Sequence, residues 1–261
     1  MGKKKVKGTN VHKRSQISIF IIIAIVIVVI ISLIFYLMQN KINNTINPEI
    51  APVYSYTENC IKDSGLQSVK VIGLTGGGYN NSRKTDTGIL YYLYDGEKNS
   101  PTKQDIEEEI NTLTGYFTSL CISNLSSFPD YVINIGNMTS NTIVNENNVK
   151  LNVDFPVSIT KGTKSYSIKN FNNIEIPIRL GYILNATNEI VNENLNHPDS
   201  LCLNCLYNIS NKYGLIGSVH DFDYDKSLII LTDPQSKIYG NNFAFVFAIK
   251  FKNITKGGEI I

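Results

Sequence analysis

The strongest constraint on this chain is an uninterrupted apolar segment close to its N-terminus. Residues 17–38 contain no charged side chain, and most of them are Ile, Val, Leu or Phe. As an α-helix this segment would be about 33 Å long, which is enough to cross a hydrocarbon core of roughly 30 Å. A backbone in lipid must satisfy its own hydrogen bonds, so even β-branched residues become helical there. We predict a transmembrane helix over residues 17–38.

The sequence on either side of this segment predicts its orientation. Lysines and Arg14 crowd the first 14 positions without an acidic residue, whereas the whole chain has a net charge of +2. The positive-inside rule therefore places residues 1–16 in the cytoplasm and the remainder outside it. The residues after 38 offer no small-residue cleavage site, so we expect a retained anchor in the cell membrane. The basic patch that a nucleic-acid partner would require is missing beyond the anchor.

The start of the apolar segment carries a short motif. Ser15, Gln16 and Ser18 follow two basic residues, and Phe20 occupies the next alternate position. Segment 13–20 resembles the start of an archaeal type IV pilin-like signal, in which a peptidase cuts before the Gln of a Gln-x-Ser-x-Glu motif. The resemblance marks Ser15, Gln16 and Ser18 as a candidate processing site, although Phe20 replaces the Glu. It implies a pilin-like surface filament subunit, which is our alternative function.

The rest of the chain carries a second resemblance. Its features are Cys60-Ile61-Lys62-Asp63, a glycine run at 76–78 with Tyr79, a tyrosine-rich segment at 91–94, and an acidic helix ending at Cys121. With these features, residues 48–251 resemble uncharacterised membrane-anchored ectodomain proteins of small-genome archaea. The resemblance implies a location and an architecture, and it carries no activity.

Helical periodicity appears at several places beyond a polar linker at residues 39–48. A first helix is predicted from about Glu49, either ending near Gly65 or continuing to Ile72. A second begins after Thr102, because Thr102 and Asp105 resemble a capping box. Two further helices are expected, over about 183–195 and from a cap at Asp199 or Ser200 to about 212.

Between and after these helices the apolar residues alternate as in half-buried strands. Strands are predicted over 88–95, 149–159, 164–171, 174–180, 215–220, 227–232 and 242–251. Both faces of 242–251 are apolar, so this strand is expected to be central. Helices and strands interleave without a βαβ rhythm, which favours an α+β fold with a largely antiparallel sheet and packed helices.

Serine and asparagine cluster near residues 126–146 and suggest an internal boundary. It would separate a small α/β subdomain, 49–126, from a sheet-and-helix subdomain, 127–252. Residues 253–261 would then form a C-terminal tail.

Four cysteines in a domain outside the cytoplasm are candidates for disulfide bonds. Of the three possible pairings we favour one that joins Cys60 to Cys121, because both lie on apolar helix faces. Cys202 and Cys205 form a CxxC, which predicts a local disulfide or a buried thiol pair. Their flanks lack the aromatic residue and Pro of thioredoxin-like sites, so thiol–disulfide exchange stays a second alternative function.

Three further groups of polar residues are candidate metal ligands. A zinc site would draw on His197, Cys202, Cys205 and His220, at loose spacing. A calcium site would draw on Asp221, Asp223 and Asp225, which lack the Gly and Glu of an EF-hand loop and fit a polar hairpin turn. The acidic run Glu107, Glu108 and Glu109 points in different directions around a helix and fits a solvated first turn. We therefore expect no metal site and no cofactor.

Several Asn residues begin N-x-[ST] sequons. The glycosylation candidates are Asn43, Asn80, Asn124, Asn137 and Asn253, whereas Asn185 and Asn208 fall within predicted helices, where access is expected to be restricted.

The sequence contains no Ser/His/Asp order, phosphate-binding loop or carboxylate pair that would indicate catalysis, so we do not expect an enzyme. The patterns together predict a single-pass membrane-anchored domain outside the cytoplasm, serving as a binding or structural component of the envelope. Its expected partners are the lipid bilayer and another envelope or surface protein.

Overall fold

The computed structural model describes residues 23–33, 46–78, 83–123, 128–197, 200–223 and 225–252. The chain divides into two compact units, Met1–Asn47 and Pro48–Ile261. In the first unit, residues 23–33 form an α-helix whose side chains are all exposed. Within the described ranges, every helix is too short or too polar to cross a membrane. Residues 17–22 and 34–38 of the predicted span, and the candidate processing site, lie outside these ranges.

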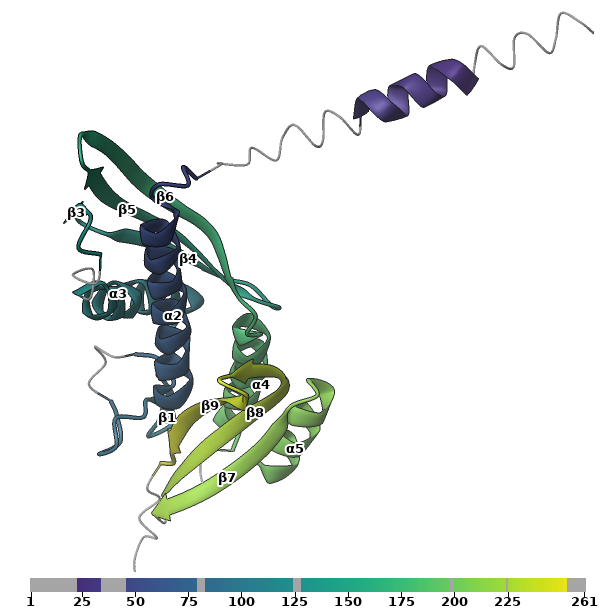
Figure 1. Ribbon diagram of the computed structural model, residues 1–261. Coiled ribbons are helices and arrows are strands. Elements are labelled where there is room, and N and C mark those ends of the chain that lie inside the picture. The colour runs from purple at the N-terminus through teal and green to yellow at the C-terminus, as the bar shows by residue number, and fades with distance from the viewer. Residues whose placement is uncertain are drawn as a thin grey trace, which may run out of the picture. The chain divides into compact units, whose positions relative to one another are not determined.

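The second unit is an α+β fold, as predicted (Figure 1). Its helices are α2 (Ala51–Thr75), α3 (Lys103–Ile122), α4 (Leu180–Leu195) and α5 (Leu203–Lys212). Its strands are β1 (Tyr91–Tyr94), β2 (Glu97–Lys98), β3 (Val132–Ile135), β4 (Thr139–Val144), β5 (Val149–Lys161), β6 (Lys164–Ile176), β7 (Ile216–Asp223), β8 (Lys226–Ile238) and β9 (Asn241–Lys250).

The strands form two sheets rather than the single sheet expected. One has the order β2-β1-β9-β8-β7, in which β1 and β9 are parallel and the other neighbours antiparallel. In the other, β5 pairs with β6 along one edge and with β3 and β4 along the other. β9 lies between β1 and β8, which confirms its predicted central position. Residues on both sides of the boundary expected near residue 126 belong to the one unit Pro48–Ile261, and the pairing of β1 with β9 crosses that boundary.

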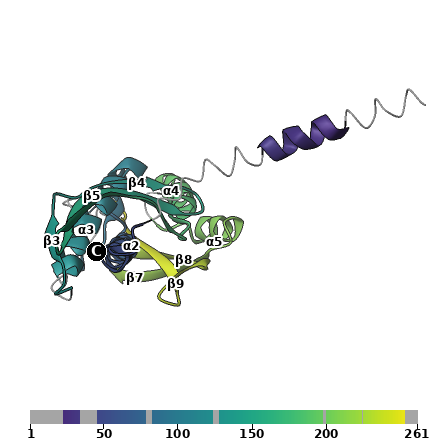
Figure 2. The ribbon, with the colours of Figure 1, turned by 45° about the horizontal axis from the view of Figure 1, so that its top comes forward.

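Helix α2 connects the two sheets, because it packs against β6 as well as β9 (Figures 1 and 2). Two glycines allow this close approach. A Cβ atom at Gly65 would meet the Leu151 side chain of β5, and one at Gly73 would lie 2.6 Å from the carbonyl oxygen of Ala244 in β9. The apolar side chains of both sheets and the helices form one buried core. Gly65 therefore serves as a packing site, and the helix does not end there.

The helix ends show which local signals the sequence carries. The capping box at Thr102 and Asp105 is present, as predicted. Helix α2 begins at Ala51 instead of Glu49, and Gly76 ends it in the left-handed conformation that glycine adopts without strain. The N-cap of α5 is Cys202, two residues beyond the later of the two predicted caps.

The long-range disulfide is the predicted one, between Cys60 of α2 and Cys121 of α3. Cys60 is buried, and the two helices pack along each other. The disulfide therefore holds together helices α2 and α3, which pack against the two sheets.

Candidate functional site

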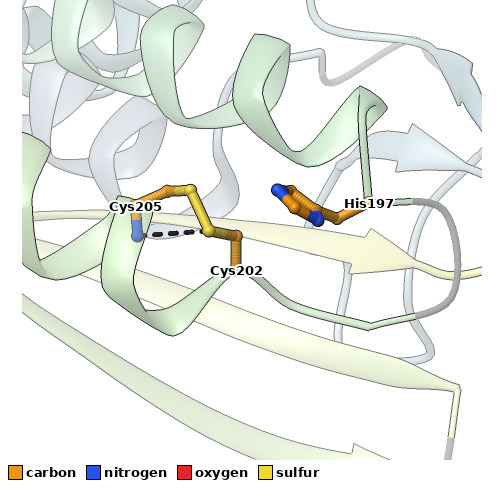
Figure 3. A group of neighbouring side chains, drawn as sticks. All are labelled: His197, Cys202 and Cys205. Atoms are coloured by element: carbon orange, nitrogen blue, oxygen red, sulfur yellow. Dashed lines mark hydrogen bonds between the residues drawn. A yellow bond between two sulfur atoms is a disulfide. The ribbon is translucent and has the colours of Figure 1, made fainter.

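The second disulfide, Cys202–Cys205, lies at the N-terminus of helix α5 (Figure 3). Cys202 is the N-cap, and its Sγ accepts a hydrogen bond of 3.2 Å from the backbone N–H of Cys205. Both cysteines are half-buried. This confirms the local disulfide predicted from the CxxC spacing. The first N–H groups of a helix carry partial positive charge, so this position favours a thiolate whenever the bond is reduced.

A buried amide holds this site against helix α4. The side-chain oxygen of Asn194 accepts the N–H of Cys202 at 3.0 Å, and its amide nitrogen donates to the carbonyl oxygen of Ile190 at 2.8 Å. The backbone carbonyl oxygen of Asn194 accepts the N–H of His197 at 3.0 Å. One residue thus positions both the first cysteine and the histidine. Sequence reasoning missed Asn194, because an Asn in the last turn of a helix carries no signal of such a role.

His197 lies beside the disulfide, at an exposed position after α4 (Figure 3). One ligand atom each from His197, Cys202 and Cys205 lie within 4.8 Å of one another. Throughout the described ranges this is the one group of three or more His, Cys, Asp or Glu residues whose candidate ligand atoms lie this close together. His220, on β7, is not part of it, so the four-ligand zinc hypothesis does not hold in its original form.

The face of α5 next to the disulfide is apolar and open. Leu203, between the two cysteines, is 61% exposed, and Tyr207 one turn later is 68% exposed. Residues four apart lie on the same face of a helix. The disulfide is thus accompanied by side chains suited to contact another molecule.

The acidic candidates for metal binding do not converge. Asp221 accepts a hydrogen bond from Ser227, and Asp223 pairs with Lys226 at 2.9 Å. Asp225 is buried, and its Oδ1 has no partner within the described structure. The contacts of Asp221 and Asp223 agree with the polar turn expected between β7 and β8, whereas the burial of Asp225 does not.

The acidic run of α3 differs from expectation, because two of its members make structural contacts. Glu107 accepts the backbone N–H of Val144 in β4 at 2.8 Å. Glu109 accepts the N–H of Gly78, just after α2. Consecutive helix positions face different neighbours, so these acids join α3 to two other elements instead of forming a solvated turn.

A cleft of about 980 Å³ lies between the end of α2, helix α3 and the segment after β2. Its volume falls within the range of small-ligand sites. The charged and apolar side chains that line it are Asp105, Glu108, Glu109, Lys98, Val71, Pro101, Leu113, Tyr116 and Phe117. Hydrogen bonds from Thr102 hold the pKa of Asp105 below its usual value, which keeps that carboxylate charged. Local sequence patterns do not indicate this cleft.

Two aromatic rings form one wall of the cleft. Tyr116 and Phe117 lie edge to face with their ring centroids 5.4 Å apart, and Tyr116 is 59% exposed. Acids outnumber the single lysine of the lining, and aromatic faces attract cations. The chemistry of the cleft therefore suits a ligand that carries a positive charge and an apolar part.

The sequons are only partly covered by the described ranges. Asn137 is exposed in the loop between β3 and β4. Asn185 and Asn208 lie in α4 and α5, as predicted, and both are exposed rather than shielded. Asn43, Asn80, Asn124 and Asn253 lie outside the described ranges.

Comparison of the chain with protein-family models, with curated proteins and with solved structures finds no match.

Proposed function

We propose that this chain is a single-pass membrane protein whose folded unit lies outside the cytoplasm and binds another component of the envelope. The charge-free segment 17–38 and the basic residues before it support the anchor and its orientation. The helix over residues 23–33 exposes apolar side chains, which a lipid environment would cover. The location outside the cytoplasm is supported by the disulfide bonds, and the binding surface by the cleft along α3.

Disulfide bonding supports the compartment and is the observation that carries the proposal. The chain has four cysteines, and all of them are paired, in Cys60–Cys121 and Cys202–Cys205. Structural disulfides persist in oxidising environments and are rare in the reducing cytosol. Such pairing is expected of a domain that is exported across the membrane.

The cleft along α3 is the proposed binding surface. It combines Asp105, Glu108 and Glu109 with the aromatic rings of Tyr116 and Phe117. A basic side chain of a partner protein would meet carboxylates and ring faces there. The predicted partner is therefore an envelope protein that presents lysine or arginine.

Photo-crosslinking on intact cells tests this function. A photo-reactive amino acid at Tyr116, inside the cleft, should give a discrete adduct on illumination. The same residue at Tyr239, which is 54% exposed and does not line the cleft, is the matched control and should give none. Adding Glu108→Lys should weaken the Tyr116 adduct severalfold. Equal labelling from both positions, or none from Tyr116, would refute the cleft as the binding surface.

Thiol–disulfide exchange is the second candidate, and the location of Cys202 at the N-cap of α5 favours it. An attacking sulfur at a helix N-terminus is stabilised as the thiolate. The reduced full chain should then reduce a disulfide-bonded peptide, and Cys202→Ser should abolish the activity. If Cys202→Ser still reduced the peptide, Cys202 would not be the attacking group.

A further inference from the structure

We propose that reduction of the Cys202–Cys205 disulfide creates a binding site for a thiophilic divalent cation, of which Zn²⁺ is the representative, with His197 as the third ligand. This inference concerns residues distant in sequence from the cleft of α3, so it stands or fails independently of the proposed binding function. It departs from the expectation that the chain has no metal site. It rests on three neighbouring ligands and on the contacts that hold them.

The donor set suits zinc. Zn²⁺ is a borderline-soft cation that binds soft thiolates and imidazole nitrogen, and a CxxC spacing is typical of zinc sites. In a tetrahedral site with Zn–S bonds near 2.3 Å the donor atoms are about 3.8 Å apart. The ligand atoms of His197, Cys202 and Cys205 lie within 4.8 Å of one another while the two sulfurs are bonded. Reduction lets the sulfurs move apart to the separation that the metal requires, with exposed His197 beside them.

Neighbouring groups prepare the ligands. Asn194 fixes the backbone of both Cys202 and His197, and it is completely buried. The N–H of Cys205 points at the sulfur of Cys202, where it would support a metal-bound thiolate. Such outer contacts orient metal ligands and raise affinity. Three protein ligands leave a fourth position for water or for a group from a partner.

The two states of the site exclude each other. A dithiol reductant supplies two electrons and two protons to the Cys202–Cys205 bond and leaves as its own cyclic disulfide. Binding of the cation then displaces the two thiol protons into solvent, because the thiolate is the metal ligand. With the metal bound, neither sulfur is free to attack the other. The site therefore senses whether its surroundings are oxidising or reducing.

Cobalt titration of the full chain in detergent tests the proposal. Co²⁺ reports thiolate ligation through a sulfur-to-metal charge-transfer band, and Zn²⁺ should displace it. The reduced chain should bind one equivalent, and the oxidised chain none. His197→Gln should weaken binding about tenfold or more, in line with the effect of disturbing a metal site. The matched control is His220→Gln, which removes a histidine outside the group and should leave affinity unchanged.

Several results of these titrations would contradict the proposed metal site. Binding that is undiminished in Cys202→Ser would show that Cys202 is not a ligand, and binding unchanged in His197→Gln would show that His197 is not one. Either outcome, or no charge-transfer band at all, overturns the proposal. Circular dichroism shows whether each variant is folded. As a second measurement on the unaltered chain, Zn²⁺ should slow re-formation of the disulfide after the reductant is removed, and an unchanged rate would also overturn it.

Discussion

At the scale of single residues, the clearest feature is a buried ion pair at the start of α4. The guanidinium of Arg179 binds the carboxylate of Asp233 in β8 through two hydrogen bonds, of 2.6 and 3.0 Å. The Asp233 side chain is completely buried. Burial alone would raise the pKa of Asp233, but Arg179 and Ser236 donate hydrogen bonds to its carboxylate and hold that pKa below its usual value.

We predict that Asp233→Asn lowers the free energy of unfolding by about 3 kcal/mol, because it leaves the Arg179 charge buried without its partner. Denaturant titration measures this loss. Asp154→Asn is the matched control, since Asp154 forms an exposed pair with Lys169, and it should cost less than about 1 kcal/mol. Similar losses in both variants would contradict the structural role of the buried pair.

The same carboxylate predicts a pH dependence. Because the folded-state pKa of Asp233 is lowered, its contribution to stability is present above the unfolded-state pKa of about 3.9 and is lost as the pH falls through the folded value. Stability curves measured between pH 6 and pH 2 should therefore converge for the unaltered chain and Asp233→Asn at the acidic end. A constant difference across that range would exclude this charge as the cause.

At the scale of elements, α2 matters most, because its glycines allow it to approach both sheets. Gly73→Ala places a methyl group 2.6 Å from a backbone oxygen of β9 and 2.7 Å from the ring of Phe243. We predict a loss of about 2 kcal/mol from this overpacking. Gly115→Ala on α3 is the control, since nothing lies within 4 Å of the new methyl group, and it should gain up to about 1 kcal/mol from helix propensity. Thermal unfolding distinguishes the two, and effects of the same sign would contradict the packing described.

The disulfides provide a second comparison between elements. Cys60 and Cys121 are 61 positions apart, whereas Cys202 and Cys205 are 3 apart. By loop-closure entropy, replacing the first pair with alanine should cost about 4 kcal/mol and the second about 2 kcal/mol. Denaturant titrations of the two double variants measure these losses. A larger loss from the short loop would show that the entropy of the unfolded chain is not the main term.

At the scale of the whole molecule, the features that could be predicted from the sequence are those that depend on local patterns. Strand periodicity, the capping box at Thr102 and the Cys60–Cys121 bond could be inferred, because each follows from spacing within one or two elements. The parallel pairing of β1 with β9 could not, since it joins segments far apart in the chain and leaves no local trace. The support that Asn194 gives to Cys202 and His197, and the cleft along α3, likewise arise only from tertiary packing.

The central claim is that residues 17–38 anchor the folded unit outside the cytoplasm. Protease treatment of sealed inside-out membrane vesicles tests it directly, with the full chain detected by an antibody against residues of the second unit. If residues 17–38 are the anchor, the folded unit survives in sealed vesicles and is digested once detergent opens them. Digestion of the folded unit in the sealed vesicles would place it on the cytoplasmic side and exclude this topology.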